Sequence, residues 1–203
     1  MKIGSRGTHP SVAGLLLAAG GGRRLGGRPK ALLEAGGQLL VERAAGVLRE
    51  GGCELVHVVL GAAEPEVRKR AKLQGCKLIS NPDWPTGMAS SLRAGLTSLE
   101  PTTASAALIM LVDQPRIGAE AIARLIRTHA EGATLAAASY GGDRGNPVLI
   151  ARKHWPATTA AATGDRGARD FLRTHHAELT LVECADVATP DDIDTPNDLN
   201  LLD

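Results

Sequence analysis

The chain has very few aromatic residues: two Trp, one Tyr and one Phe among 203 residues. Its core therefore has to be built from aliphatic side chains, and the hydrophobic share of 43% is ordinary for a globular protein. A chain of this length is expected to form one domain with a substantial hydrophobic core.

An excess of charge of one sign is also missing. The 23 basic and 22 acidic residues give a net charge of +1, which argues against a nucleic-acid partner or a membrane surface. No apolar stretch approaches the ~18 residues of a membrane span, and the polar N-terminus has no apolar segment of the kind found in secretion signals. We therefore expect a cytoplasmic protein, with a loose tail over residues 1–11 and a single domain over residues 12–203.

Cysteine and histidine are sparse and show no ligand pattern. Cys53, Cys76 and Cys184 lie far apart and lack C-x-x-C spacing, so they fit neither a zinc site nor a disulfide framework. We expect buried, unreactive thiols. The six histidines, including His175 and His176, are interpreted as surface residues.

Apolar runs that resemble strands alternate with amphipathic stretches that resemble helices. This alternation predicts βαβ units and an α/β fold, a Rossmann-like three-layer sandwich with a mostly parallel sheet. In such sheets ligands bind outside the carboxyl ends of the strands. Strands are predicted over Val12–Leu17, Glu54–Leu60, Cys76–Ile79, Ala106–Val112, Thr134–Ser139, Pro147–Ile150 and Leu179–Val182, and helices over Leu39–Glu50, Glu64–Leu73, Met88–Leu99, Ala119–Glu131 and Ala168–His175.

A glycine-rich basic loop follows the first predicted strand. Residues 18–30 hold five glycines and four cations. Glycines let backbone N–H groups approach an anion closely, and the cations supply charge-assisted bonds to phosphates. The pattern is not a P-loop, because Ala31 follows Lys30, and not a dinucleotide fingerprint, because Leu25 stands at the third glycine position. The loop binds a polyphosphate, or it is an ordinary turn with surface arginines.

A single acid follows the predicted strand that ends at Val112. Asp113 precedes Gln114 and Pro115, so its carboxylate is expected at the ligand crevice. Mg²⁺ typically takes one or two protein carboxylates and completes its shell with water and phosphates. The alternative is a turn residue that bonds to its own backbone.

Four carboxylates lie within eight residues near the C-terminus: Asp191, Asp192, Asp194 and Asp198. Part of this run is explained by a final helix that is capped by Asp194 or Thr195, with Pro196 in its first turn. Helix capping does not explain the acids before the helix, which repel one another unless a cation lies between them.

A long loop enters the predicted helix that starts at Met88. Its segment Asn81–Leu96 contains Ser90 and Ser91, whose hydroxyls suit a base or a ribose, next to free N–H donors of the helix N-terminus. The alternative is simple capping of the helix, with Trp84 as a packing residue.

These motifs, in this order, resemble the MobA-like nucleotidyltransferases, and among them the molybdenum cofactor cytidylyltransferase (MocA-like) branch. The loop resembles the family pattern Leu-Ala-Ala-Gly-x-Gly-x-Arg-Leu/Met-Gly with a following Lys, and residues 81–96 resemble a segment that recognises cytosine in related enzymes. The resemblance implies the nucleotide-diphospho-sugar transferase type of fold. It also implies a nucleotide site formed by Leu17, Ala18, Ala19, Gly20, Gly22, Arg24, Lys30, Asn81, Gly87 and Ser91.

The same resemblance implies the catalytic and metal-binding residues. Arg24, Lys30 and Asp113 are expected to act in catalysis, with Mg²⁺ held by Asp113 and Asp194. Asp192 is the alternative second ligand. No side-chain nucleophile is implied, because the acceptor's own phosphate attacks.

Two further segments resemble those that line the molybdopterin pocket in the family. The segments Tyr140–Val148 and Gly164–Arg169 imply an acceptor site. Asn146 stands where histidine is frequent in relatives, and the two arginines either bind an acceptor phosphate or face solvent. The predicted acceptor residues are Asn146, Pro147, Arg166 and Arg169.

The implied reaction is transfer of CMP from CTP, or a nucleotide from another NTP, to the terminal phosphate of a molybdopterin-type cofactor, with release of pyrophosphate. A molybdenum hydroxylase would be the recipient of the product. The alternatives are another phosphorylated acceptor such as a sugar or alditol phosphate, an NAD(P)H-dependent oxidoreductase that acts on a heterocycle, and a non-catalytic pterin carrier. The presence of Arg24, Lys30 and Asp113 favours a transferase.

Overall fold

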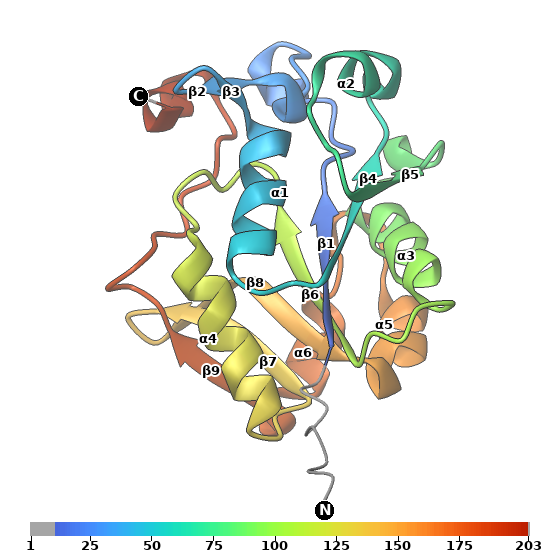
Figure 1. Ribbon diagram of the computed structural model, residues 1–203, viewed down its shortest axis with the longest axis vertical. Coiled ribbons are helices and arrows are strands. Elements are labelled where there is room, and N and C mark those ends of the chain that lie inside the picture. Colours follow the sequence, from blue (N-terminus) through green and yellow to red (C-terminus); the bar gives the residue numbers. More distant parts are fainter. Residues whose placement is uncertain (1–10, 203) are drawn as a thin grey trace, which may run out of the picture.

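A seven-stranded sheet forms the centre of the computed structural model, which describes residues 11–202 (Figure 1). The strand order is β5-β4-β1-β6-β8-β7-β9. The strands span Val12–Leu17 (β1), Leu55–Leu60 (β4), Cys76–Ser80 (β5), Ala106–Leu111 (β6), Leu135–Tyr140 (β7), Asp143–Ala151 (β8) and Leu179–Glu183 (β9). A small hairpin of Glu34–Ala35 (β2) and Gln38–Leu39 (β3) lies outside this sheet.

The sheet is mostly parallel, as predicted, with one antiparallel strand. β5, β4, β1 and β6 pair in parallel, and β9 pairs in parallel with β7. β8 is antiparallel to both β6 and β7. The reason is the two-residue connection Gly141–Gly142, in which both φ values are positive, because so short a turn joins only antiparallel strands.

Helices cover both faces of the sheet and complete three layers (Figure 1). Alternate residues of β1 enter different cores: Leu16 packs in the cluster that includes helices α1 and α4, and Leu15 in the cluster with α3, α5 and α6. Both clusters are mainly aliphatic, as the composition predicts. The helices span Leu40–Glu50 (α1), Glu64–Arg70 (α2), Met88–Leu99 (α3), Ala119–Ala130 (α4), Trp155–Ala161 (α5) and Arg169–Thr174 (α6).

Three local predictions need correction. The β2–β3 hairpin and α5 were not predicted, because two-residue strands and a seven-residue helix are too short to show a clear period. The predicted final helix is a 3₁₀ helix over Pro196–Leu202. Neither Asp194 nor Thr195 caps it through its side chain. Instead, the Asp198 carboxylate accepts bonds from the N–H groups of Asp194 and Thr195.

The histidine prediction is wrong for His57. This residue lies on β4 with 3% of its surface exposed, and its Nδ1 is 2.8 Å from the Ser98 hydroxyl. Burial, followed by the nearby charge of Lys77, lowers the pKa of His57. Among the cysteines, Cys53 and Cys184 are buried as expected, whereas Cys76 is half-buried.

The N-terminal tail prediction falls mostly outside the described residues. Residues 1–10 are not described, but the Ser11 carbonyl accepts a 2.8 Å bond from the Ser105 N–H, so this residue is fixed to the domain. Within residues 11–202, no helix combines the length and apolar character needed to cross a bilayer.

Glu183, the last residue of β9, fixes the β7–β8 turn. Its carboxylate accepts bonds from the N–H groups of Gly141, Gly142 and Ala185 and from the Ser139 hydroxyl. These backbone donors hold the pKa of Glu183 at about 2, below its ordinary value of 4.5. The charged carboxylate therefore stabilises the fold.

We predict that Glu183→Gln lowers the thermal unfolding midpoint at pH 7, because an amide presents N–H groups to the same donors. A carboxylate with a depressed pKa stabilises the fold above its unfolded pKa, and this stabilisation is lost as the pH falls through the folded value. The midpoint difference from the wild type should therefore shrink between pH 4.5 and pH 2. Thermal melts across this range test the prediction, with the exposed Glu131→Gln as control. A pH-independent difference would contradict it.

Candidate functional site

The candidate site lies at the carboxyl edge of the central parallel strands. β1 and β6 are neighbours in register, with Leu17 opposite Leu111. The glycine-rich loop leaves the end of β1, and Asp113 follows the end of β6. The pairing of these two strands thus brings the predicted phosphate loop and the predicted metal ligand to the same edge.

The loop folds back on itself around Gly22. This residue has a φ of 62°, and its carbonyl accepts bonds from the N–H groups of Leu25 and Gly27. A Cβ on Gly22 would lie 1.9 Å from the Arg28 carbonyl oxygen. A glycine is therefore required here by both backbone conformation and space. The short 3₁₀ turn Arg23–Leu25 (η1) follows and leaves Arg23 and Arg24 exposed.

Lys30 joins the two acids that were predicted to bind the metal. Its Nζ donates to Asp113 Oδ2 and to Asp194 Oδ1, both at 2.6 Å. Burial opposes a charge on Lys30, but the two carboxylates outweigh it and raise the pKa of the ammonium above 10.5. The bond from Lys30 is also the main cause that lowers the pKa of Asp194. Lys30 and Asp194 are therefore both charged at neutral pH.

Arg24 approaches the same site from the solvent side. Its guanidinium lies 3.1 Å from Asp194 Oδ2, although 73% of its side chain is exposed. Asp194, not Asp192, is thus the C-terminal acid that contacts the loop cations. Desolvation and the negative charge of Asp113 raise the pKa of Asp192 to about 6.

The two carboxylates fit a magnesium ion that also binds phosphate. Within residues 11–202 there is no group of three or more His, Cys, Asp or Glu arranged to hold a metal, so an all-protein cage is absent from this part. Mg²⁺ commonly uses only one or two carboxylates together with substrate phosphates. Asp113 Oδ1 is buried and has no hydrogen-bond partner, an unmet need that a bound cation satisfies.

The predicted base-binding segment is ordered by its own side chains. The buried Asn81 donates from Nδ2 to the hydroxyls of Ser90 and Ser91, at 2.9 and 3.0 Å, and its Oδ1 accepts from the Asp83 N–H. Asn81 therefore holds the loop against the start of α3, and its contact with a nucleotide stays a prediction. Trp84 packs tightly against Gly61 and Gly21, which links this segment to the phosphate loop.

A cavity of about 140 Å³ opens at the end of β1, from which the phosphate loop leaves. It contains three of the four predicted acceptor residues, Asn146, Arg166 and Arg169, whereas Pro147 is buried in β8 and does not line it. Arg166 is also paired with Asp170 at 3.0 Å. The full lining is Leu17, Met88, Leu92, Ile109, Leu111, Arg144, Gly145, Asn146, Val148, Asp165, Arg166, Gly167, Ala168, Arg169 and Leu172.

Arg144 and Asp165 were not singled out as cavity residues from the sequence. Both lie inside the two segments from which an acceptor site is predicted, and this position in the sequence is the signal that could have identified them. The cavity has an apolar floor, which includes the ends of β1 and β6, and a charged rim. Such a surface suits a ligand with an apolar body and an anionic group.

The base segment and the acceptor segment touch each other. Gly87 has a φ of 113°, and a Cβ on it would lie 2.6 Å from Gly164 and 2.7 Å from Asp165 Oδ1. A Cβ on Gly167 would likewise lie 3.0 Å from the Met88 sulfur. These close contacts put the predicted nucleotide and acceptor regions next to each other at the N-terminus of α3.

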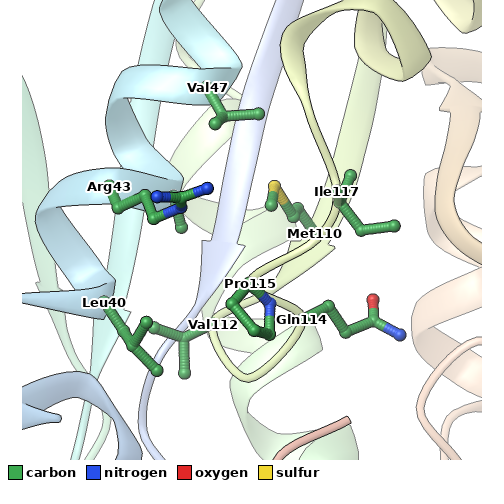
Figure 2. A pocket seen from close by; sticks show the side chains of 9 residues that line it. Leu40, Arg43, Val47, Met110, Val112, Gln114, Pro115 and Ile117 are labelled. Carbon is green, nitrogen blue, oxygen red and sulfur yellow. The ribbon is translucent and has the colours of Figure 1, made fainter. Parts of the chain in front are cut away.

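A much smaller pocket lies between α1 and the turn after β6. It measures about 10 Å³ and is lined by residues of α1 and of the turn after β6 (Figure 2). Figure 2 shows Leu40, Val112 and Pro115 around it, with the Gln114 amide pointing away from α1. This volume holds no more than about one water molecule, so it is no substrate site.

Comparison with known proteins identifies the relatives of the chain. A family model described as MobA-like NTP transferase domain matches residues 14–179. Nicotine blue oxidoreductase of Paenarthrobacter nicotinovorans is 41% identical over 192 residues, which cover 92% of this chain and 93% of the relative. Molybdenum cofactor guanylyltransferase of Shewanella halifaxensis is 30% identical, over 81% of this chain and 80% of the relative.

Solved structures agree with the sheet topology. The homologue of Rv0371c from Mycobacterium sp. strain JC1 superposes with a TM-score of 0.83 at 34% identity, over 94% of both chains. Rv0371c of Mycobacterium tuberculosis in complex with manganese gives 0.78 at 25% identity, over 95% of this chain and 97% of that one.

We predict that Gly22→Ala destabilises the loop and the protein, whereas Gly20→Ala does not. The first substitution combines a positive φ with a severe backbone clash, and strain of this kind costs on the order of 1–3 kcal/mol. At Gly20 a Cβ meets nothing within 4 Å, so we expect a change within about 0.5 kcal/mol. Urea unfolding of both variants measures the free energies. Equal stability of the two variants would show that the loop is not built around Gly22.

Proposed function

Because the chain belongs to the MobA-like NTP transferase family of nucleotidyltransferases, we propose that it transfers CMP from CTP to the terminal phosphate of a molybdopterin-type cofactor. A phosphate oxygen of the acceptor forms a bond to the α-phosphorus of CTP, and the bond to the pyrophosphate group breaks. The acceptor supplies the nucleophile, so this chain needs none. The product would then pass to a molybdenum hydroxylase.

The observation that carries this proposal is the cluster of Arg24, Lys30, Asp113 and Asp194. Lys30 is charged and has only 14% of its side chain exposed, at the foot of a glycine-rich loop. Charge-assisted bonds from such a partly desolvated cation to a triphosphate are strong. Arg24 adds a second cation on the same loop. Catalysis would then consist of positioning and charge neutralisation, as in phosphoryl transfer generally.

The proposed metal is Mg²⁺, held by Asp113 and Asp194. The unpaired, buried Asp113 Oδ1 supports this assignment, and so does the manganese complex of the structural relative Rv0371c. When bound, the ion would neutralise negative charge on the phosphates. Asp113 and Asp194 would fix its position relative to the loop, and Lys30 would be released toward the phosphates.

CTP is proposed as the donor because of the segment Asn81–Leu96. Asn81 is hydrogen-bonded to Ser90 and Ser91 in the first turn of α3. These bonds hold the backbone groups of that turn in place. A rigid site that hydrogen-bonds one base edge discriminates strongly against another base, because polar groups are then left unpaired.

The acceptor site is proposed to be the cavity of about 140 Å³ at the end of β1. Arg144 and Arg169 line it and make no ion pair within residues 11–202, so they are free to bind an anionic group. Small-molecule sites usually measure about 300–1,000 Å³. The cavity is therefore suited to one part of the acceptor, with the rest lying over the neighbouring loops.

We expect pyrophosphate release to require both CTP and molybdenum cofactor, with Mg²⁺ present. Rates with GTP, ATP and UTP should be lower by a factor on the order of 100, because a mismatched base leaves buried polar groups unpaired. A coupled pyrophosphate assay with each NTP, with and without acceptor, makes the measurement. Faster turnover with GTP would reject the cytidylyl assignment. Pyrophosphate release from CTP with a sugar phosphate, in the absence of molybdenum cofactor, would reject the proposed acceptor.

We predict that Asp113→Asn reduces metal-dependent pyrophosphate release by a factor on the order of 100 or more. Asparagine keeps the volume and the turn, but it removes the charge that holds the metal. CTP binding measured by calorimetry in EDTA should be partly retained. The control is Asp191→Asn, an acid of the C-terminal run that contacts Arg116 and Thr189. If Asp113→Asn keeps full activity, Asp113 is only a turn residue.

A second candidate function is an NAD(P)H-dependent oxidoreductase that acts on a heterocycle. The relative named nicotine blue oxidoreductase, 41% identical over 92% of this chain, favours it. The apolar floor and cationic rim of the cavity suit a heterocycle as well. The Asp113→Asn variant separates the two functions, since oxidation of NADPH, followed by its absorbance, would not need a phosphate-binding metal. The charged cluster of Lys30 with two carboxylates supports the transferase.

A further inference from the structure

The two loop cations hold the carboxylates that the metal would need. Asp113 Oδ2 and Asp194 Oδ1 both accept from Lys30, and Asp194 Oδ2 is paired with Arg24. The fourth oxygen, Asp113 Oδ1, is buried beneath the surface. In this arrangement, none of the four carboxylate oxygens of these two acids is both accessible and free of a cation.

A divalent ion cannot join this arrangement without a movement of Lys30. Two oxygens that contact one ammonium at 2.6 Å face a common point, and an ion bonded to both would have to lie at much the same place. The ion would also carry two positive charges next to a charged lysine, in a setting where only 14% and 17% of the Lys30 and Asp113 side chains are exposed. Repulsion between like charges is only weakly screened there.

Arg24 and Lys30 are also the cations that the glycine-rich loop offers to phosphates. A triphosphate that binds the loop competes with the carboxylates for both cations. When Lys30 and Arg24 turn to the phosphates, three carboxylate oxygens lose their partners together. Unpaired carboxylates in a partly buried site are costly. The free energy of binding a divalent cation is therefore much more favourable once the two cations have turned away.

We propose that Lys30, assisted by Arg24, competes with the divalent cation for Asp113 and Asp194, so that the metal binds weakly until a nucleotide draws the two side chains away. The nucleotide part of this inference rests on the proposed function; the competition between Lys30 and the metal does not. Lys30 thus controls when the metal binds, before it acts on the phosphates. The coupling is reciprocal, because each ligand favours the arrangement that the other needs.

The test is Mn²⁺ binding by the nucleotide-free protein, followed by the electron paramagnetic resonance signal of free Mn²⁺. Lys30→Met removes the ammonium but keeps most of the side-chain length. We expect it to bind Mn²⁺ about tenfold or more tightly than the wild type, within the usual range of coupling between sites. Arg24→Met should give a smaller gain, since Arg24 is 73% exposed and pairs with one oxygen.

The matched control is Arg23→Met in the same 3₁₀ turn. Arg23 is exposed and makes no ion pair within residues 11–202, so its loss removes an equal charge without freeing a carboxylate. Mn²⁺ affinity should be nearly unchanged. Adding Asp113→Asn to Lys30→Met should remove the gain, which assigns the extra binding to this site.

Several results would overturn the inference. One is a Lys30→Met variant that binds Mn²⁺ no better than the wild type, and another is an equal gain in Arg23→Met. If Lys30→Met does not fold, Arg24→Met decides the question: a gain supports the competition and no gain overturns it. CTP binding in EDTA is measured separately and should weaken in Lys30→Met. If CTP binding is not weakened in Lys30→Met, this result counts against the proposed nucleotide site. The competition between Lys30 and the metal would still stand.

Discussion

The ion triad of Lys30, Asp113 and Asp194 is the interaction on which the site depends. Asp113 and Asp194 come 83 and 164 positions after Lys30 in the sequence, and all three lie at the carboxyl edge of the sheet. Two carboxylates that share so small a space repel each other unless a cation lies between them. Lys30 supplies that cation in the free protein. The triad thus brings together the acids suited to a metal and the cation suited to a phosphate.

The C-terminal segment is held at this site by hydrogen bonds to its backbone and by the buried Ile193 side chain. The Ile193 N–H donates to the Asp113 carbonyl at 2.9 Å, beside the end of β6. Asp198 then turns the chain by accepting bonds from the backbone of Asp194 and Thr195. Asp194 does not have to cap the last turn, so its carboxylate is left for Lys30 and Arg24. An acid that sequence patterns connect with helix capping is thereby made available for the site.

The sequence was most informative where a periodic pattern or a ligand motif extended over several residues. The alternation of strands and helices, the phosphate loop and the position of Asp113 followed from such patterns. The resemblance favours Asp194 over Asp192 as the second metal ligand; the structure places Asp194 against Lys30, and its role as a ligand stays a prediction. The direction of β8 was missed because its cause is a two-residue turn, and His57 was missed because a single histidine within an apolar strand gives no sign of its Ser98 partner. Arg144 was missed because only the fold brings β8 and the Gly164–Arg166 turn (η5) to one cavity.

The phosphate loop and the cavity of about 140 Å³ depend on largely different elements of the fold. The phosphate loop and its acids depend on β1, β6 and the C-terminal segment, whereas the cavity depends on β8, α3 and η5. The two regions share the ends of β1 and β6, so side chains on the cavity rim can change without disturbing Lys30. Relatives named as a guanylyltransferase and as an oxidoreductase share this fold, as expected when activity is carried by local sites and not by the fold itself. For this chain, the two carboxylates of the triad suit a metal ion, which hydride transfer from NAD(P)H does not require.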